Sequence, residues 1–359
     1  MRQHKRLQLV PMSSPAEQLE GKQIDGEWVI GPLQPKNPLA TGGNFSQSYN
    51  ATKDGRVAFV KALDFKRAFA SGGDMTKILQ QVLELFNFEV DMLRFCEAKR
   101  MDRVVRAIGS GIIDTDGTPF GQVPYLLFEA ADADMRRHLD DPVLGAGVAW
   151  KLRCMHHITT GLKQLHGADV VHQDLKPSNV LIFRATEPTR ISKLADLGRA
   201  SRSSGYSPFD HMDWAGDPKY APPEVHYGFI QTDWHLRRIG YDLYMLGSIM
   251  CFLFTRTTAY SLLMKALPSQ LWPGNWGDTY ENVLPYLDHA FADTEAELSK
   301  QVPSSLASEL ITIYSQLCKP DPRKRGYPGQ RINKVALERY ISIFDRLSRS
   351  TELGRYQVS

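Results

Sequence analysis

The residues with the clearest chemical potential form the run His172-Gln173-Asp174-Leu175-Lys176-Pro177-Ser178-Asn179. It places a carboxylate, an ammonium and an amide close together in the chain. A carboxylate can orient a hydroxyl, an ammonium can neutralise a phosphoryl group, and an amide oxygen can help to hold Mg²⁺; together these are the requirements of phosphoryl transfer. The alternative interpretation is a polar turn between two strands, because apolar residues 170–171 and 180–183 flank the run.

The elements around this run change in character near residue 130. Before it, Asp54-Gly55 predicts a hairpin turn, and a period of 3.6 residues predicts a long helix. The predicted elements are strands over Phe45–Thr52, Val57–Leu63, Val104–Ile113 and Gln122–Phe128 and a helix over Met75–Lys99. After residue 130 we expect helices over Ala146–His166, Leu236–Thr255 and Ser304–Cys318, short strands over Val170-Val171, Val180–Phe183 and Ile191–Ala195, and a loop from Arg199 to Pro218.

Composition narrows the class of protein. The 359 residues suggest two domains or lobes, and 42% apolar and 23% charged residues are ordinary globular values. The net charge of +3 is too small to indicate nucleic-acid binding by bulk charge. Four cysteines without CxxC spacing predict reduced thiols of a cytoplasmic chain. The densest apolar run, Met245–Phe254, is too short to span a bilayer, and no secretory signal is expected.

The run resembles the catalytic loop of protein kinases, whose pattern is H-R-D-L-K-P-x-N. The resemblance implies that Asp174 orients the attacking hydroxyl, that Lys176 stabilises the transferred phosphoryl group and that Asn179 holds Mg²⁺, with His172 as structural support. Asp196-Leu197-Gly198, after a predicted strand, resembles the D-F-G metal site, with Leu in place of Phe. Asp196 would then be the second Mg²⁺ ligand, although Asp-x-Gly alone is a common turn.

Three downstream patterns resemble the same family. Gly216-Asp217-Pro218-Lys219-Tyr220-Ala221-Pro222-Pro223-Glu224 resembles the end of the activation segment, G-T-P-x-Y-x-A-P-E, with Asp217 in place of Thr and Pro222 in place of Ala. Arg325, in Asp321-Pro322-Arg323-Lys324-Arg325, is the implied ion-pair partner of Glu224. Asp242 would hold the backbone of the catalytic loop. Each pattern is weak alone, and their order strengthens all three.

In the first part of the chain, Val57-Ala58-Phe59-Val60-Lys61 resembles the V-A-x-K strand, with one additional residue. Lys61 would bind the α- and β-phosphates and pair with a glutamate of the long helix. Glu84 and Glu89 compete for this role, and Glu89 lies on the apolar stripe that faces inward whereas Glu84 lies opposite. We therefore predict Glu89. The gap of 28 residues between Lys61 and Glu89 implies an insertion around 71–74.

The nucleotide contacts follow only from the resemblance. Thr41 to Ser46 aligns poorly with the glycine-rich loop, and a plain turn between strands is the alternative. Leu127-Phe128-Glu129-Ala130-Ala131 resembles the hinge that meets adenine, although Phe128 could equally be an ordinary core residue. Besides Lys61 and Glu89, the implied nucleotide-site residues are Thr41, Gly42, Gly43, Asn44, Phe45, Ser46, Ala58, Phe128, Glu129, Ala131, Asp134 and Leu181.

The resemblance implies an α+β, bilobal protein-kinase fold with ATP between the lobes. The expected parts are an N-terminal arm (1–24), a nucleotide-binding lobe (25–130), a catalytic lobe (131–346) and a C-terminal tail (347–359). The implied activity is transfer of the γ-phosphoryl group of ATP to Ser/Thr hydroxyls of proteins, including the chain itself, with Mg²⁺ or alternatively Mn²⁺. The alternatives are a pseudokinase scaffold and a small-molecule kinase. A protein substrate is expected, with no nucleic-acid or membrane partner, and a regulatory partner would use the tails or residues 257–300.

Regulation can also be predicted from Gln173. Many regulated kinases have Arg before the catalytic Asp, where it receives a phosphate from the activation segment (here residues 196–224). Gln173 carries no charge and cannot make this bidentate contact. The sequence therefore predicts activity without phosphorylation of the segment, although it contains the acceptors Ser201, Ser203, Ser204, Tyr206 and Ser207.

Overall fold

A two-residue turn at Asp54-Gly55 joins the two central strands of the first sheet. In the computed structural model, β3 (Ser46–Lys53) and β4 (Arg56–Leu63) pair antiparallel, with Lys53 opposite Arg56. Asp54 and Gly55 have φ of 48° and 74°, and positive φ at both central residues is what this turn requires. The predicted hairpin is confirmed.

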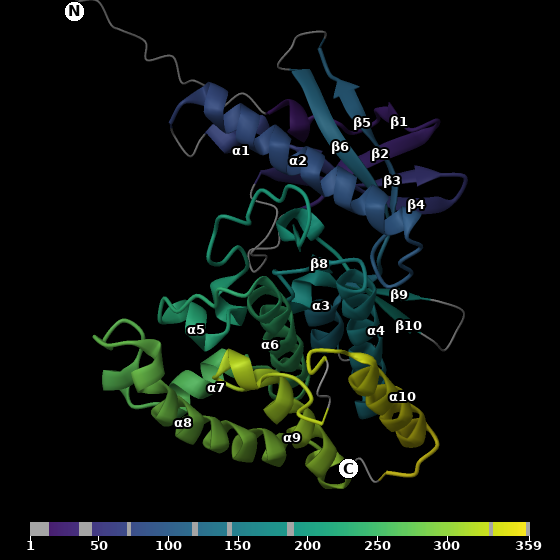
Figure 1. Cartoon of the computed structure of the whole chain (residues 1–359). Helices are drawn as coiled ribbons and strands as arrows, with labels where there is room; N and C mark the ends of the chain where they lie inside the picture. Colours follow the sequence, from purple (N-terminus) through teal and green to yellow (C-terminus); the bar gives the residue numbers. More distant parts are fainter. Residues whose placement is uncertain are drawn as a thin grey trace, which may run out of the picture. The chain divides into compact units, whose positions relative to one another are not determined.

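The structure describes residues 14–35, 45–69, 73–116, 121–141, 146–184, 190–329 and 333–356. The chain divides into unit 1, Met1–Val90 with Arg106–Ala130, and unit 2, Asp91–Val105 with Ala131–Ser359. Unit 1 holds a six-stranded antiparallel sheet in the order β1-β2-β3-β4-β6-β5 (Figure 1). Its other strands are β1 (Gln23–Ile24), β2 (Trp28–Leu33), β5 (Ala107–Asp114) and β6 (Gln122–Glu129).

The N-terminal arm is shorter than predicted. Ala16, Leu19 and Ile24 are buried in the core of this sheet. The Tyr49 hydroxyl donates a hydrogen bond to the Ala16 carbonyl (2.6 Å). The polar composition of residues 1–24 suggested a solvated arm, but a few apolar side chains suffice to attach residues 14–24 to the sheet.

Helix α2 (Met75–Ala98) begins at a capped end, after the short helix α1 (Phe65–Phe69). Asp74 Oδ1 accepts hydrogen bonds from the backbone N–H groups of Thr76 (2.9 Å) and Lys77 (3.3 Å), as an N-cap does. Val82, on the predicted apolar stripe, packs in a cluster with Leu63 at the end of β4. The predicted helix is confirmed, and its packing aligns it with the strand that carries Lys61.

Short strands hold the catalytic loop in unit 2. The loop begins after β8 (Val170–Val171), which pairs with β11 (Ser201–Arg202), and ends at β9 (Val180–Arg184). Strand β9 pairs on one side with β10 (Arg190–Leu194), which leads to Asp196, and on the other with β7 (Ala133–Asp134). The loop and Asp196 are thus positioned by neighbouring strands.

Helices form most of unit 2, as the α+β prediction requires (Figure 1). The central helix α6 begins two residues before the predicted start because Asp233 caps it, accepting a hydrogen bond from Leu236 N at 2.7 Å. Residues 240–253 of α6 are all buried. The helices are α3 (Met135–Asp140), α4 (Val148–His166), α5 (Pro223–His226), α6 (Trp234–Thr255), α7 (Ala259–Ala266), α8 (Tyr280–Gln301), α9 (Ser304–Cys318) and α10 (Glu338–Glu352).

Two predicted boundaries of the catalytic lobe are wrong. Residues 91–105 belong to unit 2, and the end of this stretch is bonded to β10: Val105 N donates to Leu194 O (2.8 Å) and Leu194 N to Arg103 O (2.8 Å). At the other end, α10 extends to Glu352 with Leu347 buried, so the predicted tail from residue 347 is partly core. The sequence alone does not show whether an amphipathic helix packs against another element. Here the packing partner of α10 is α4.

Residues 257–300, predicted as a partner surface or as packing, contain α7, α8 and a 3₁₀ turn over Ser269–Leu271. Trp272 Nε1 donates to the carbonyls of Met264 (3.1 Å) and Leu267 (3.0 Å), although the side chain is partly exposed.

No single helix of the described residues is long and apolar enough to cross a membrane. Helices α6 and α7 reach the required length and apolar character only together, and they are bent by 80° at the break between them.

Candidate active site

The buried carboxylate of Asp242 determines the course of the catalytic loop in unit 2. Its oxygens accept hydrogen bonds from the backbone N–H groups of His172 (2.9 Å) and Gln173 (3.0 Å). His166 Nε2 lies 2.8 Å from Asp242 Oδ2. Gln173 has φ of 61°, a strained conformation for a residue with a side chain, and these bonds hold it there.

The buried side chain of Asp174 accepts three hydrogen bonds. It is 2% exposed, and its Oδ2 accepts from Lys176 Nζ (2.9 Å) and Asn179 Nδ2 (3.2 Å). Its Oδ1 accepts from the backbone N–H of Asp217 (2.8 Å). Burial raises the pKa of Asp174 above its ordinary value, and the neighbouring Lys176 ammonium opposes that rise. The carboxylate is therefore oriented on both oxygens and more basic than an exposed one.

Lys176 lies between two carboxylates. Besides Asp174, Asp217 Oδ2 approaches its Nζ at 3.9 Å, and all three side chains are nearly inaccessible to solvent. Asp217 also caps the 3₁₀ turn Pro218–Tyr220, where its side chain accepts from Lys219 N (3.0 Å). The positive charge of Lys176 is thus shared between the carboxylates of Asp174 and Asp217.

Asn179 and Asp196, the predicted metal ligands, come together through the backbone. Ala195 N donates to Asn179 O (2.9 Å), which places Asp196 next to Asn179. The Asn179 amide N–H₂ is bonded to Asp174, so its Oδ1 is directed away from that residue. Asp196 has φ of 62°, another strained conformation of the kind found at functional sites.

This donor set fits a magnesium ion. Mg²⁺ prefers hard oxygen ligands and is usually held by one or two carboxylates, with waters and substrate phosphates completing its shell. The described residues contain no cluster of three or more His, Cys, Asp or Glu with metal-binding geometry. One carboxylate and one amide oxygen therefore suit an ion that phosphates share, and not a closed structural metal site.

In unit 1, Lys61 forms an ion pair with Glu89. Its Nζ lies 2.7 Å and 2.8 Å from the two carboxylate oxygens of Glu89, whose side chain is buried. Glu84 is exposed, as the helix-face argument predicts. Lys61 stands in β4, with Ser48 of β3 and Leu126 of β6 opposite it. The pair thus connects the long helix to the centre of the sheet.

Ala58, which was predicted to contact the nucleotide, does not share the face of β4 that carries Lys61. Ala58 is 0% exposed and belongs to the core on one face of the sheet, together with Val60. Side chains alternate along a strand, so Phe59, which the sequence reading did not select, shares the face of Lys61. The rings of Phe59 and Phe128 lie 6.4 Å apart. Counting two residues back from Lys61 would have placed Phe59 on the face of that lysine.

The remaining predicted nucleotide residues belong to both units, and some lie outside the described part of the chain. Thr41, Gly42, Gly43 and Asn44 lie outside the described residues. Phe45 is exposed, Ser46 begins β3 with its side chain buried, and Glu129 Oε1 accepts from Arg106 N (2.8 Å). In unit 2, Asp134 caps α3 by accepting from Arg137 N (2.9 Å) and pairs with Leu181 across β7 and β9, while Ala131 is half-buried before β7.

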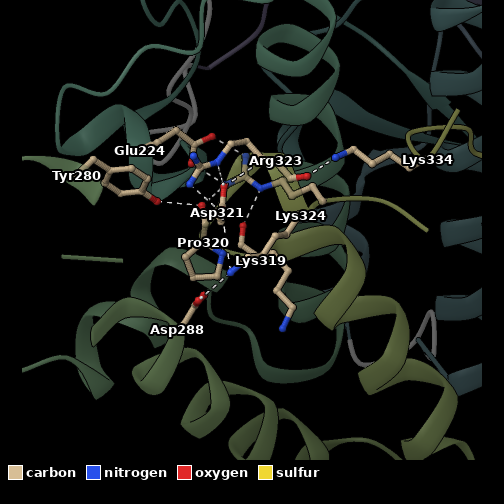
Figure 2. Close-up of polar contacts among 10 residues, drawn as sticks. Glu224, Tyr280, Asp288, Lys319, Pro320, Asp321, Arg323, Lys324 and Lys334 are labelled. Carbon is tan, nitrogen blue, oxygen red and sulfur yellow. Dashed lines mark hydrogen bonds and ion pairs between the residues drawn. The ribbon is translucent and has the colours of Figure 1, made fainter. Parts of the chain in front are cut away.

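Glu224 and Arg325 form a fully buried bidentate ion pair (Figure 2). Arg325 Nη1 donates to Glu224 Oε1 (2.5 Å) and Nη2 to Oε2 (2.6 Å). Arg325 also donates to the carbonyls of Lys319 (2.8 Å) and Pro320 (3.2 Å). The Tyr280 hydroxyl donates to the same Pro320 carbonyl (2.9 Å), and Figure 2 shows the two residues directed toward one another. The pair joins the end of segment 196–224 to the turn after α9.

Comparison with known proteins agrees with this geometry. Residues 42–334 match the sequence family described as the protein kinase domain. Serine/threonine-protein kinase Pkn1 of Myxococcus xanthus is 30% identical over 174 residues, 46% of this chain and 22% of that protein. Calcium/calmodulin-dependent protein kinase type I of Schizosaccharomyces pombe is 32% identical over 121 residues, 33% and 31% of the two chains. The chain thus spans less than a third of the length of each of these relatives.

Proposed function

Because the chain belongs to the protein kinase family, we propose that it transfers the γ-phosphoryl group of ATP to Ser/Thr hydroxyls of protein substrates, itself included, in a Mg²⁺-dependent reaction. The observation that carries the proposal is Asp174, buried and oriented on both carboxylate oxygens beside Lys176. The similarity to Pkn1 of Myxococcus xanthus, which is named a serine/threonine-protein kinase, supports the choice of hydroxyl.

In this reaction the substrate hydroxyl attacks the γ-phosphorus, a new O–P bond forms, and the bond to the β-phosphate oxygen breaks. Asp174 orients the hydroxyl and accepts its proton, for which its raised pKa is suited. Lys176 stabilises charge on the transferred group. Lys61, held by Glu89, binds the α- and β-phosphates. Asn179 and Asp196 would hold Mg²⁺, which when bound would neutralise phosphate charge.

The test is incubation of the purified full chain with γ-labelled ATP and Mg²⁺, alone and with a basic protein substrate, followed by mapping of phosphosites by mass spectrometry. Asp174→Asn is the matched control, because it keeps the size of the side chain and removes the base. Label on serine or threonine that depends on Asp174 supports the proposal. ATP binding without any transfer would indicate a pseudokinase, and transfer to small molecules only would indicate a small-molecule kinase.

A further inference from the structure

Arg238 is a buried cation in α6, one helical turn before Asp242. It is 0% exposed. No carboxylate of the described residues lies within ion-pairing distance of its guanidinium. Burial, reinforced by the neighbouring charge of Arg237, lowers the pKa of Arg238. A buried charge is costly unless hydrogen bonds satisfy it, so the partners of this side chain indicate its role.

Those partners belong to the catalytic loop and to the activation segment. Arg238 Nη1 donates to the side-chain oxygen of Gln173. Its Nη2 donates to the carbonyls of Met212 (2.9 Å) and Asp210 (3.1 Å), and more distantly to that of Phe209 (3.5 Å). One guanidinium therefore holds the middle of the segment against the residue that precedes Asp174.

Gln173 extends this connection to other parts of the segment. Its Nε2 donates to Arg199 O (3.1 Å), and the Arg199 guanidinium donates to Ala215 O. At Gly216 a Cβ atom would collide with the Gln173 carbonyl oxygen, so the segment approaches the loop as closely as glycine allows. The next residue, Asp217, donates its N–H to Asp174. Gln173 is thus bonded through both ends of its amide.

The contact with Arg238 explains why a neutral side chain suits position 173. An arginine there would place a second guanidinium against Arg238 in a buried site, where like charges repel strongly. The acceptors of Arg238 are the amide oxygen of Gln173 and backbone carbonyls of the segment, so none of them needs a phosphate. Two segment serines are also bonded internally: Ser201 donates to the Asp210 carboxylate, and Ser207 Oγ accepts from Arg202 N (3.0 Å).

We infer that Arg238 is a positioning residue that, given the proposed kinase activity, holds the activation segment in its working arrangement through Gln173 and the carbonyls of residues 209, 210 and 212. This contact replaces the phosphate that orders the segment in phosphorylation-dependent kinases. The segment is consequently ordered as synthesised, and removal of phosphate leaves the activity unchanged.

The experiment compares phosphatase-treated full chains: wild type, Arg238→Met, Arg238→Lys and, as the matched control, Arg237→Met. Arg237 is adjacent on α6, and its side chain makes no hydrogen bond among the described residues. We expect Arg238→Met to lower kcat about tenfold or more, with ATP affinity unchanged and partial recovery in Arg238→Lys. Arg237→Met should match wild type.

Hydrogen exchange separates positioning from general instability. In Arg238→Met, faster exchange should be confined to residues 199–218, with α4 and α9 unchanged. Gln173→Leu, which removes the acceptor without burying a new charge, should give the same pattern if Arg238→Met does not fold. Turnover of Arg238→Met within threefold of wild type, or faster exchange throughout α4 and α9, would overturn the inference. A wild type that transfers no phosphate would reject the proposed function instead, and exchange in 199–218 would still test the segment contact.

Discussion

Asp217 Oδ2 lies 3.9 Å from Lys176 Nζ, while the backbone N–H of the same residue donates to Asp174. The carboxylate therefore competes with Asp174 and with a transferred phosphoryl group for one ammonium. In the family pattern this position is Thr, whose side chain is similar in size and carries no charge. The arrangement suggests that the chain works with a partly neutralised lysine.

We therefore expect Asp217→Thr to raise kcat about two- to fivefold, which corresponds to roughly 0.4–1 kcal/mol in the activation barrier. The backbone N–H to Asp174 remains in this variant. Steady-state kinetics with a peptide substrate measure the change, and Asp217→Asn serves as the control for side-chain size. A fall in kcat of both variants would mean that the second carboxylate assists catalysis.

The pH dependence should report the pKa of Asp174. Burial raises this pKa above the ordinary value of 3.8, and the base must be deprotonated to accept the hydroxyl proton. As pH falls through the raised pKa, kcat/KM should decline, so the acid limb lies at higher pH than for an unperturbed aspartate. Rates over a pH series, with folding checked by circular dichroism at each pH, give the midpoint. A midpoint at or below 3.8 contradicts the prediction.

Asp174 and Asp196 should differ in the step they affect. Asp174→Ala removes the group that acts on the hydroxyl, so we expect kcat to fall about 10²–10⁴-fold with nucleotide affinity retained. Asp196→Ala removes a predicted metal ligand and should weaken Mg²⁺–ATP binding as well. Calorimetric titration with a non-hydrolysable ATP analogue, with and without Mg²⁺, distinguishes the two. Near-normal turnover of Asp174→Ala would require a different catalytic loop.

The Lys61–Glu89 pair offers a matched comparison on one helix. Glu89→Gln should lower kcat about tenfold, because the neutral amide holds Lys61 less firmly. Lys61→Met should cost more, since it removes the cation itself. Glu84→Gln, on the exposed face, is the control and should be silent. If Glu84→Gln is damaging and Glu89→Gln is not, the functional assignment of this pair is wrong.

The buried Glu224–Arg325 pair should act on stability. Glu224→Gln leaves the Arg325 guanidinium buried without its counter-ion, and the loss of one partner typically destabilises by about 3–5 kcal/mol. Urea unfolding monitored by tryptophan fluorescence measures the free energy of unfolding. The exposed pair Arg346–Glu309 provides a control, since Glu309→Gln should change it by less than about 1 kcal/mol. Equal effects of the two changes would refute the distinction.

Local signals in the sequence were sufficient for several elements. Asp54-Gly55 specifies its turn, and Asp74 and the 3.6-residue stripe specify α2. The spacing from His172 to Asn179 indicates the protein kinase family, which the match over residues 42–334 shows. In each case the relevant interactions join residues near one another in the chain. Helical periodicity likewise selected Glu89 over Glu84, because the apolar stripe defines the face of the helix that packs inward.

Tertiary structure decided what depends on distant partners. Whether residues 14–24 and 347–352 are core or tail depends on the sheet and on α4, which offer the apolar surfaces that cover them. The role of Arg238 is invisible in sequence, since one acceptor is the side chain of the distant Gln173 and the others are backbone carbonyls, which every residue carries. The sharing of Lys176 by Asp174 and Asp217, 43 residues apart, likewise exists only once the segment has folded back onto the loop.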